Sequence, residues 1–231
     1  MTDSNDVLRE KLNTAWRFFY RRGFVDGFGH ISARTSDPER ILITPHDLTK
    51  HSRPEEFALI DLDGNQYGSA VKLPAELPIH LEVYKVRADV GSVAHFHCLY
   101  PTSFSMSSVP LRPTFFMASI FRDGVPIHPD ARLILDAERG AALAETLASH
   151  RAALMKAHGI VVTGATVEEM TAVAYILEEN AHRTWVTAAM GEVEYLTDEA
   201  MAEIEAELLK TQAPFKRIWA LCRQEGGDEG G

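Results

Sequence analysis

Short β-prone segments lie close together in this 231-residue chain, and helical segments precede, separate and follow them. Alternating or continuous apolar patterns predict strands at Ile31–Thr35, Ile41–Thr44, Phe57–Asp61, Ser92–His97, Ala153–Lys156 and Ile160–Thr163. The Asp63-Gly64-Asn65 step is typical of a turn into a further strand, as in an antiparallel meander. Helices must cover such a sheet, so the pattern predicts an α/β or α+β sandwich around a mostly antiparallel sheet.

Apolar spacing and capping residues predict the helices. They are expected at residues 7–22, 75–87, 137–149, 166–190 and 197–210. Thr166 and Glu169 match the capping box of an N-terminus, and Pro78 is tolerable only in the first turn of its helix. The Pro-rich residues 109–129 are expected to be mostly loop, with little order.

No repeat or composition shift divides the chain. We therefore expect one domain over residues 1–223, followed by a disordered, acidic, glycine-rich tail at 224–231. The formal net charge of −10 disfavours nucleic acid and anionic membrane surfaces as partners. Two Cys without a spacing pattern, no secretory signal and no long apolar run predict a soluble cytoplasmic protein.

The pattern with the most chemical content is His95-Phe96-His97 on a predicted strand. Alternate strand residues share a face, so His95 and His97 can bind one metal ion while Phe96 faces the core. A pair with this spacing is more often structural or exposed, and a third ligand would strengthen the metal hypothesis. His158 lies between two buried strand patterns, where it is either an ordinary turn residue or that third ligand.

Glu76 is the fourth residue of interest, near the start of the predicted 75–87 helix. A carboxylate at this end of a helix interacts favourably with the helix dipole, which is sufficient reason for its presence. The functional alternative is a metal ligand or a general acid/base. The two interpretations stay open on the residues alone.

Four stretches, in this order, resemble the class II aldolase/adducin family: GFGHISAR, ILITP, KLPAELPIHLEVYKVRADVGSVAHFHCLYPTSFS and KAHGIVVTGATVEE. The resemblance covers residues 8–191 and implies a three-layer α/β/α sandwich with a central, mostly antiparallel sheet. It implies that His95, His97 and His158 bind one divalent metal ion per subunit and that Glu76 is the catalytic acid/base. It also implies a homotetramer with sites near subunit interfaces.

These implied roles make chemical sense together. Three neutral imidazoles leave a metal ion its 2+ charge and open positions for substrate oxygens. Such an ion stabilises an enolate while a carbon–carbon bond breaks, and Glu76 moves the proton. Imidazole serves several ions, so Zn²⁺ or Mn²⁺ is expected, and Fe²⁺ is also compatible.

The chain departs from the sugar-phosphate aldolases of this family where those enzymes hold the phosphate. They carry Gly-Asn in the first glycine loop, a Thr-Pro-Ser-Gly-like segment, and two Ser before the catalytic Glu. The corresponding residues here are Gly29-His30, Thr44-Pro45-His46-Asp47 and Pro74-Ala75. Asp47 also adds a negative charge that disfavours phosphate. These differences resemble the branch that decarboxylates hydroxylated aromatic or heteroaromatic acids.

A small anionic substrate is expected to contact Gly29, His30, Thr44 and His80. His30 is alternatively a turn residue without a contact, and His80 a satisfied core residue beside Tyr84. Two arginines, Arg34 and Arg112, match a carboxylate bidentately, although a solvated surface position is the more ordinary interpretation for both. The remaining histidines are assigned to surface or structure: His46, His51, His128, His150 and His182.

We therefore expect a metal-dependent carbon–carbon lyase, foremost a decarboxylase of a hydroxylated aromatic acid. An aldolase on a small hydroxy-carbonyl substrate is an alternative, and a dehydratase or epimerase would use the same site. A non-catalytic, adducin-like interaction domain is an alternative of another class. Such a domain has no reason to keep three imidazoles and a carboxylate together.

Overall fold

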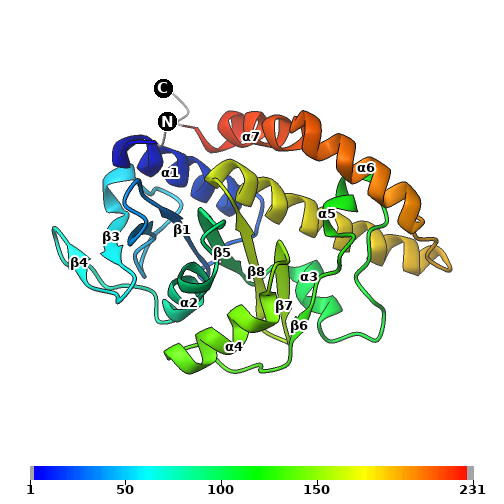
Figure 1. Cartoon of the computed structure of the whole chain (residues 1–231), viewed down its shortest axis with the longest axis horizontal. Coiled ribbons are helices and arrows are strands. Elements are labelled where there is room, and N and C mark those ends of the chain that lie inside the picture. Colours follow the sequence, from blue (N-terminus) through cyan, green and yellow to red (C-terminus); the bar gives the residue numbers. More distant parts are fainter. Residues whose placement is uncertain (1–2, 228–231) are drawn as a thin grey trace.

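One eight-stranded sheet forms the centre of the computed structural model, which describes residues 3–227 (Figure 1). Its strands are β1 (His30–Arg34), β2 (Arg40–Ile43), β3 (Ala58–Asp61), β4 (Gln66–Tyr67), β5 (Ser92–Phe96), β6 (Ile127–His128), β7 (Ala152–Met155) and β8 (Gly159–Gly164). Their order across the sheet is β4-β3-β2-β1-β5-β8-β7-β6. Only β6 and β7 pair in parallel, so the predicted, mostly antiparallel sheet is confirmed.

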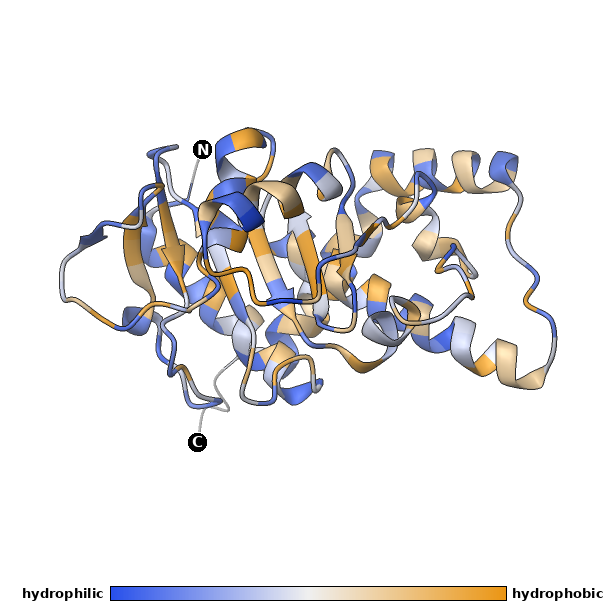
Figure 2. Cartoon of the chain, turned by 90° about the horizontal axis from the view of Figure 1, so that it is seen from below, coloured by the Kyte–Doolittle hydropathy of each residue, from blue (hydrophilic) through white to orange (hydrophobic). Residues whose placement is uncertain are grey.

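Helices cover both faces of this sheet, which confirms the three-layer sandwich (Figure 1). The helices α1 (Asn5–Arg21), α5 (Val167–Met190) and α7 (Ala213–Gly226) pack together over one face. On the other face lie α2 (Pro78–Val86) and α4 (Ala137–Leu147). Figure 2 shows that the central strands are largely hydrophobic, as sheets covered on both sides are.

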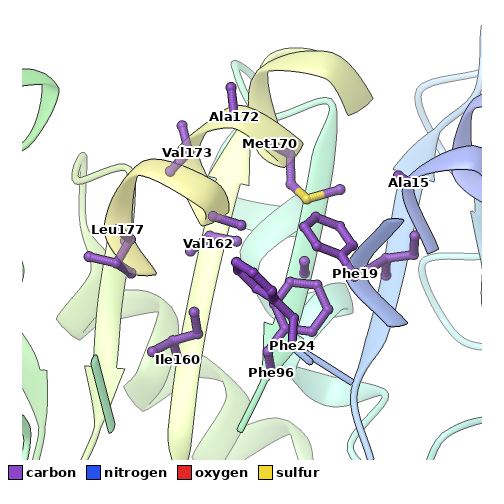
Figure 3. Packing of buried hydrophobic residues seen from close by; sticks show 14 of the residues in the cluster. Ala15, Phe19, Phe24, Phe96, Ile160, Val162, Met170, Ala172, Val173 and Leu177 are labelled. Atoms are coloured by element: carbon purple, nitrogen blue, oxygen red, sulfur yellow. The ribbon is translucent and has the colours of Figure 1, made fainter. Parts of the chain in front are cut away.

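Strand β5 shows how this layering positions functional side chains. All five of its residues are buried, and successive side chains point to opposite faces. Phe96 packs with Phe19 and Phe24 beneath α5, with ring centroids 4.5 and 5.8 Å from it (Figure 3). His95 therefore points to the opposite face, towards the segment that precedes α2.

Of the two hydrogen bonds in the capping box predicted for α5, the one to the Thr166 side chain forms. The Thr166 side chain accepts a hydrogen bond from the Glu169 amide, and the helix ends at Met190 as predicted. The Glu169 carboxylate accepts from the amide of Ala165 rather than from that of Thr166. A salt bridge between Glu169 and Arg151 then ties the start of α5 to the residue before β7.

The structure differs from the predictions at one helix start, in the order of one segment and in one additional helix. Helix α2 begins at Pro78, not at residue 75, because Pro has no N–H and fits only the first helical position; Glu76 lies in the preceding turn. Residues 109–129 are more ordered than expected, since they include the 3₁₀ helix Phe116–Phe121 and β6, with Ile120 and Phe121 buried. The short helix α3 (Leu99–Phe104) was not predicted.

The predicted disordered tail begins too early. Helix α7 continues to Gly226, and an added Cβ there would collide with the Thr14 carbonyl oxygen of α1. Beside it, Glu225 forms an ion pair with Arg22 at 2.7 Å. Residues 228–231 of that tail lie outside the described residues.

The other elements complete the chain between these layers. They are α6 (Asp198–Thr211), which confirms the helix predicted at 197–210, and the 3₁₀ turn Pro54–Glu56. Within residues 3–227, no helix combines the length and the apolar character needed to span a bilayer.

Candidate active site

Four side chains from separate parts of the chain meet at one end of the central strands. Glu76 comes from the turn before α2, His95 and His97 from the end of β5, and His158 from the β7–β8 turn. One donor atom from each lies within 4.8 Å of the donor atoms of the other three. The structure thus brings together the four residues singled out in the sequence.

His95 is fully buried, and its tautomer is fixed by the neighbouring strand. Its Nδ1 lies 2.9 Å from the carbonyl oxygen of Ile160, which can only accept, so Nδ1 carries the proton and donates. Its Nε2 is therefore unprotonated and faces the cluster, 3.1 Å from Nε2 of His97. A metal-ligating imidazole has this arrangement, with the second nitrogen held by a carbonyl.

His158 has two buried ring nitrogens: Nδ1 has no hydrogen-bond partner, and Nε2 has only a long contact of 3.4 Å with the Glu76 carboxylate. A buried polar group without a partner costs roughly 1–3 kcal/mol, which a bound cation would offset. The residue before it, Ala157, has a left-handed backbone with φ of 53°. Its amide donates to the Ser105 hydroxyl at 2.9 Å, so a side chain from elsewhere holds this strained turn in place.

Glu76 is anchored by one oxygen and directs the other at the histidines. Its Oε1 accepts from the Ile134 amide at 2.9 Å, and its Oε2 lies 3.4 Å from His158 Nε2 and 3.6 Å from His95 Nε2. Burial raises the pKa of this carboxyl. The contacts with His158 and His95 and the Ile134 amide outweigh burial and lower the pKa to about 2. Glu76 is therefore a carboxylate at neutral pH.

Two imidazoles of the cluster, those of His95 and His97, favour their neutral form. Burial is the main cause that lowers the pKa of His95 and of His97 below the ordinary value, and neighbouring histidines lower both further. Neutral imidazole is the form that binds a metal ion. Three imidazole nitrogens with one carboxylate oxygen form a donor set that suits Zn²⁺, Mn²⁺ or Fe²⁺, so these residues fit a divalent ion.

A cavity of about 200 Å³ opens beside this cluster. Its lining includes polar residues and apolar ones: His30, His46, Glu76 and His97 among the first, and Phe28, Pro45, Pro74, Ala75 and Leu133 among the second. The Phe28 ring is 67% exposed and stacks on His97 with centroids 5.7 Å apart. Sequence reasoning did not find Phe28 and placed His46 elsewhere, because loop packing alone brings them here.

Gly29 and His30 line the cavity as expected, and Gly29 is required there. Its φ is 114°, a conformation that favours glycine, and an added Cβ would lie 3.1 Å from the His95 carbonyl oxygen. Thr44, the next expected substrate contact, does not line this cavity: it is fully buried and its hydroxyl accepts from the Ile31 amide. It fixes β1, which carries His30, instead.

His80, also an expected substrate contact, does not line the cavity and lies behind His30. It is fully buried, and its Nε2 lies 2.6 Å from His30 Nδ1. Its Nδ1 lies 2.7 Å from the Ser32 hydroxyl, which in turn lies 2.9 Å from the Tyr84 hydroxyl. Burial is the main cause that lowers the pKa of His80 to about 3, so this row of side chains is uncharged.

The two arginines weighed as clamps for a carboxylate do not line the cavity. Arg34 donates to the Tyr84 carbonyl oxygen at 2.8 Å, and the Arg112 guanidinium lies 4.8 Å from the Tyr195 ring centroid. Two other histidines are structural, as assigned. His128 pairs with the Thr146 hydroxyl, and His182 stacks on Tyr100 at 4.1 Å.

The chain matches the family described as Class II Aldolase and Adducin N-terminal domain over residues 10–185. A 3,4-dihydroxyphthalate decarboxylase of Rhodococcus jostii (strain RHA1) is 27% identical over 192 residues, covering 77% of this chain and 79% of that protein. A 3-oxo-tetronate 4-phosphate decarboxylase of Haemophilus influenzae is 29% identical, with 85% and 95% covered.

Solved structures agree on the fold. An L-fuculose 1-phosphate aldolase from Glaciozyma antarctica PI12 superposes with a TM-score of 0.82 at 22% identity, covering 97% of this chain and 93% of that one. At this identity the likeness concerns the fold alone. The family match spans well over half of the chain, and the named relatives are lyases. The protein belongs to the class II aldolase and adducin family.

Proposed function

We propose that the protein is a divalent-metal-dependent decarboxylase of a hydroxylated aromatic or heteroaromatic carboxylic acid. The cavity beside Glu76 and the histidines carries this proposal, because much of its lining is apolar and includes the exposed Phe28. An apolar cavity of ~150 Å³ holds benzene, so about 200 Å³ suits a small substituted ring. The similarity to a 3,4-dihydroxyphthalate decarboxylase supports the same substrate class.

The proton transfers in this proposal belong to Glu76. A divalent ion held by His95, His97 and His158 would supply positive charge that stabilises the electron-rich ring. Glu76, as a carboxylate, accepts the hydroxyl proton and delivers it to the ring carbon that carries the carboxylate. The bond to the carboxylate then breaks, its electron pair stays with the ring, and carbon dioxide leaves. The Ile134 amide keeps Glu76 oriented throughout.

The residues at the former phosphate positions support a substrate without phosphate. Pro74 and Ala75 line the cavity where serine hydroxyls would donate, and Asp47 lies beside His46 at its rim with a contact of 2.6 Å. An aldolase on a small hydroxy-carbonyl substrate is the second candidate, since the same four side chains serve aldol cleavage. A non-catalytic interaction domain is disfavoured, because those four side chains converge in space.

The proposal extends to the surroundings of the site. We propose one zinc or manganese ion per subunit, with iron compatible, and a small anionic substrate. A homotetramer in the cytoplasm follows from the family resemblance. Large exposed apolar side chains at Leu99, Trp185 and Met190 support association between copies.

A substrate panel with defined metals tests the proposal. The protein, stripped by a chelator and reloaded with Zn²⁺ or Mn²⁺, is assayed with hydroxylated benzoates, phthalates and pyridine carboxylates for carbon dioxide, and with hydroxy-carbonyl substrates for aldehyde. We expect metal-dependent carbon dioxide release from an aromatic acid. Aldehyde release without decarboxylation supports the aldolase instead, and activity that survives complete metal removal contradicts both.

A further inference from the structure

A row of hydrogen-bonded side chains runs from the cavity into the core. It begins at His30 on the cavity wall and continues through His80 and Ser32 to Tyr84. The three successive contacts measure 2.6, 2.7 and 2.9 Å. His80 and Ser32 are fully buried and Tyr84 nearly so. Each contact needs one donor and one acceptor, so the protons of the whole row depend on one another.

Two directions of donation are consistent with these distances. In the inward direction His30 donates to His80, His80 to Ser32, and Ser32 to Tyr84. The Tyr84 hydroxyl also receives a hydrogen bond from the Val93 backbone amide, which can only donate. The phenol proton would then lack an acceptor among the described residues, since Tyr84 otherwise packs in the apolar cluster with Ile79 and Val83. A buried hydroxyl proton without an acceptor is unfavourable.

In the outward direction every proton of the row has an acceptor. Tyr84 donates to the Ser32 hydroxyl, Ser32 donates to His80 Nδ1, and His80 Nε2 donates to His30 Nδ1. His30 then carries its own proton on Nε2, the ring nitrogen that is not engaged by His80. The row thereby presents a donor, and not an acceptor, on the cavity wall.

We propose that Tyr84, Ser32 and His80 are positioning residues that fix the proton of His30 on Nε2, so that His30 is a hydrogen-bond donor to an oxygen of the substrate. The identity of that oxygen, a carboxylate or hydroxyl of an aromatic acid, rests on the proposed function. The direction of hydrogen-bond donation along the row does not rest on the proposed function. A fixed donor selects an oxygen acceptor and disfavours an N–H or a cation at this point of the substrate.

Nitrogen NMR tests the direction without any substrate. In the zinc-loaded full chain labelled with ¹⁵N-histidine, protonated and unprotonated ring nitrogens have distinct shifts, and His30→Asn and His80→Asn assign them. We expect Nε2 protonated and Nδ1 unprotonated in both residues. A proton on Nδ1 of His30 overturns the proposal, whether or not the protein proves to be a decarboxylase.

Tyr84→Phe tests what sets this direction. Without the phenol donor, Ser32 can accept as well as donate, so we expect His30 to populate both tautomers. The matched control is Thr146→Val, which removes a hydroxyl from another histidine, His128, away from the cavity. If Tyr84→Phe does not fold, Ser32→Ala tests the same step. An unchanged His30 tautomer in a folded variant contradicts the role of the row.

Ligand affinity tests the donor itself. Binding of 3,4-dihydroxybenzoate to the zinc-loaded protein is measured by calorimetry for wild type, His30→Leu and His30→Gln. Loss of a hydrogen bond to a charged oxygen should weaken binding about tenfold or more in His30→Leu, with partial rescue by the amide donor of Gln and unchanged zinc content. Equal binding by all three overturns the donor role. If the wild type does not bind while the tautomers are as expected, the proposed substrate class fails and the row stands.

Discussion

Gly159 packs against Phe96 so closely that an added Cβ would collide with the Phe96 carbonyl oxygen. The same Cβ would lie 3.0 Å from His97 Cδ2 and 3.1 Å from His95 Cε1. The absent side chain therefore provides the space in which β5 and the β7–β8 turn bring their histidines together.

Gly159→Ala should separate these elements. We expect lower zinc occupancy after reloading and a loss of about 1–3 kcal/mol in the free energy of unfolding, because the crowding atoms are backbone and ligand rings. Zinc per chain and urea denaturation measure the two effects. Gly191→Ala is the control, since nothing lies within 4 Å of a Cβ there. Full zinc occupancy in Gly159→Ala would contradict the spacing argument.

Substitutions of Glu76 and of His95 should affect zinc content and turnover differently. Glu76→Gln keeps an oxygen for the Ile134 amide but cannot accept a proton, so zinc should remain while turnover falls about 10²–10⁴-fold. His95→Ala should lose zinc and activity together. Metal analysis and steady-state rates on the best substrate of the panel measure this, with exposed His51→Ala as the control. Turnover that persists in Glu76→Gln would remove Glu76 from the chemistry.

Phe28 should determine how well an aromatic substrate binds. Phe28→Ala removes the exposed ring above His97, and we expect KM to rise about tenfold while zinc content and stability stay unchanged. Phe116→Ala, which truncates an exposed ring outside the cavity, is the control. An unchanged KM for every aromatic acid would show that the ring does not stack on substrate.

Glu178 should make stability fall as pH rises. Burial is the main cause that raises its pKa to about 7, and its Oε2 is buried without a partner. Because the folded pKa exceeds the unfolded one, the protonated carboxyl favours folding below about pH 4.5, and this contribution is lost as pH rises through 7. Glu178→Gln lacks this dependence.

We therefore expect Glu178→Gln to be more stable than wild type at pH 8, by on the order of 2–3 kcal/mol, and the difference to shrink towards pH 5. Urea denaturation at both pH values measures this. Glu145→Gln, at an exposed position of α4 on the other side of the sheet, is the control. A constant difference between pH 5 and 8 would mean that Glu178 does not titrate as described.

Elements with strong local signals could be predicted from the sequence. Helix α5 has its Thr166 cap and its Gly191 stop, and the strands have their apolar runs. Helix α7 and the end of the chain could not, because Gln224–Gly226 is polar and glycine-rich and is helical only through its packing on α1. The Pro-rich segment before β6 is ordered for the same reason, since Ile120 and Phe121 gain their burial from distant elements.

Some residues of the candidate site could likewise be predicted from the sequence, and others could not. Spacing along β5 shows that His95 and His97 can share a face, but only the family resemblance connected them with His158 and Glu76. The residues that shape the cavity could not be found from spacing. Phe28 and His46 enter it from separate loops, while Thr44, which follows β2, and His80 turn out to stand behind it.

The two edges of the sheet are its shortest strands, β4 and β6, with two residues each. A free edge invites another chain to add a strand, and very short edges give such an intruder almost no backbone to pair with. Copies of this protein therefore have to meet through helices and loops. Concentrated preparations of the folded protein are accordingly less prone to aggregate by adding strands to the edges of this sheet.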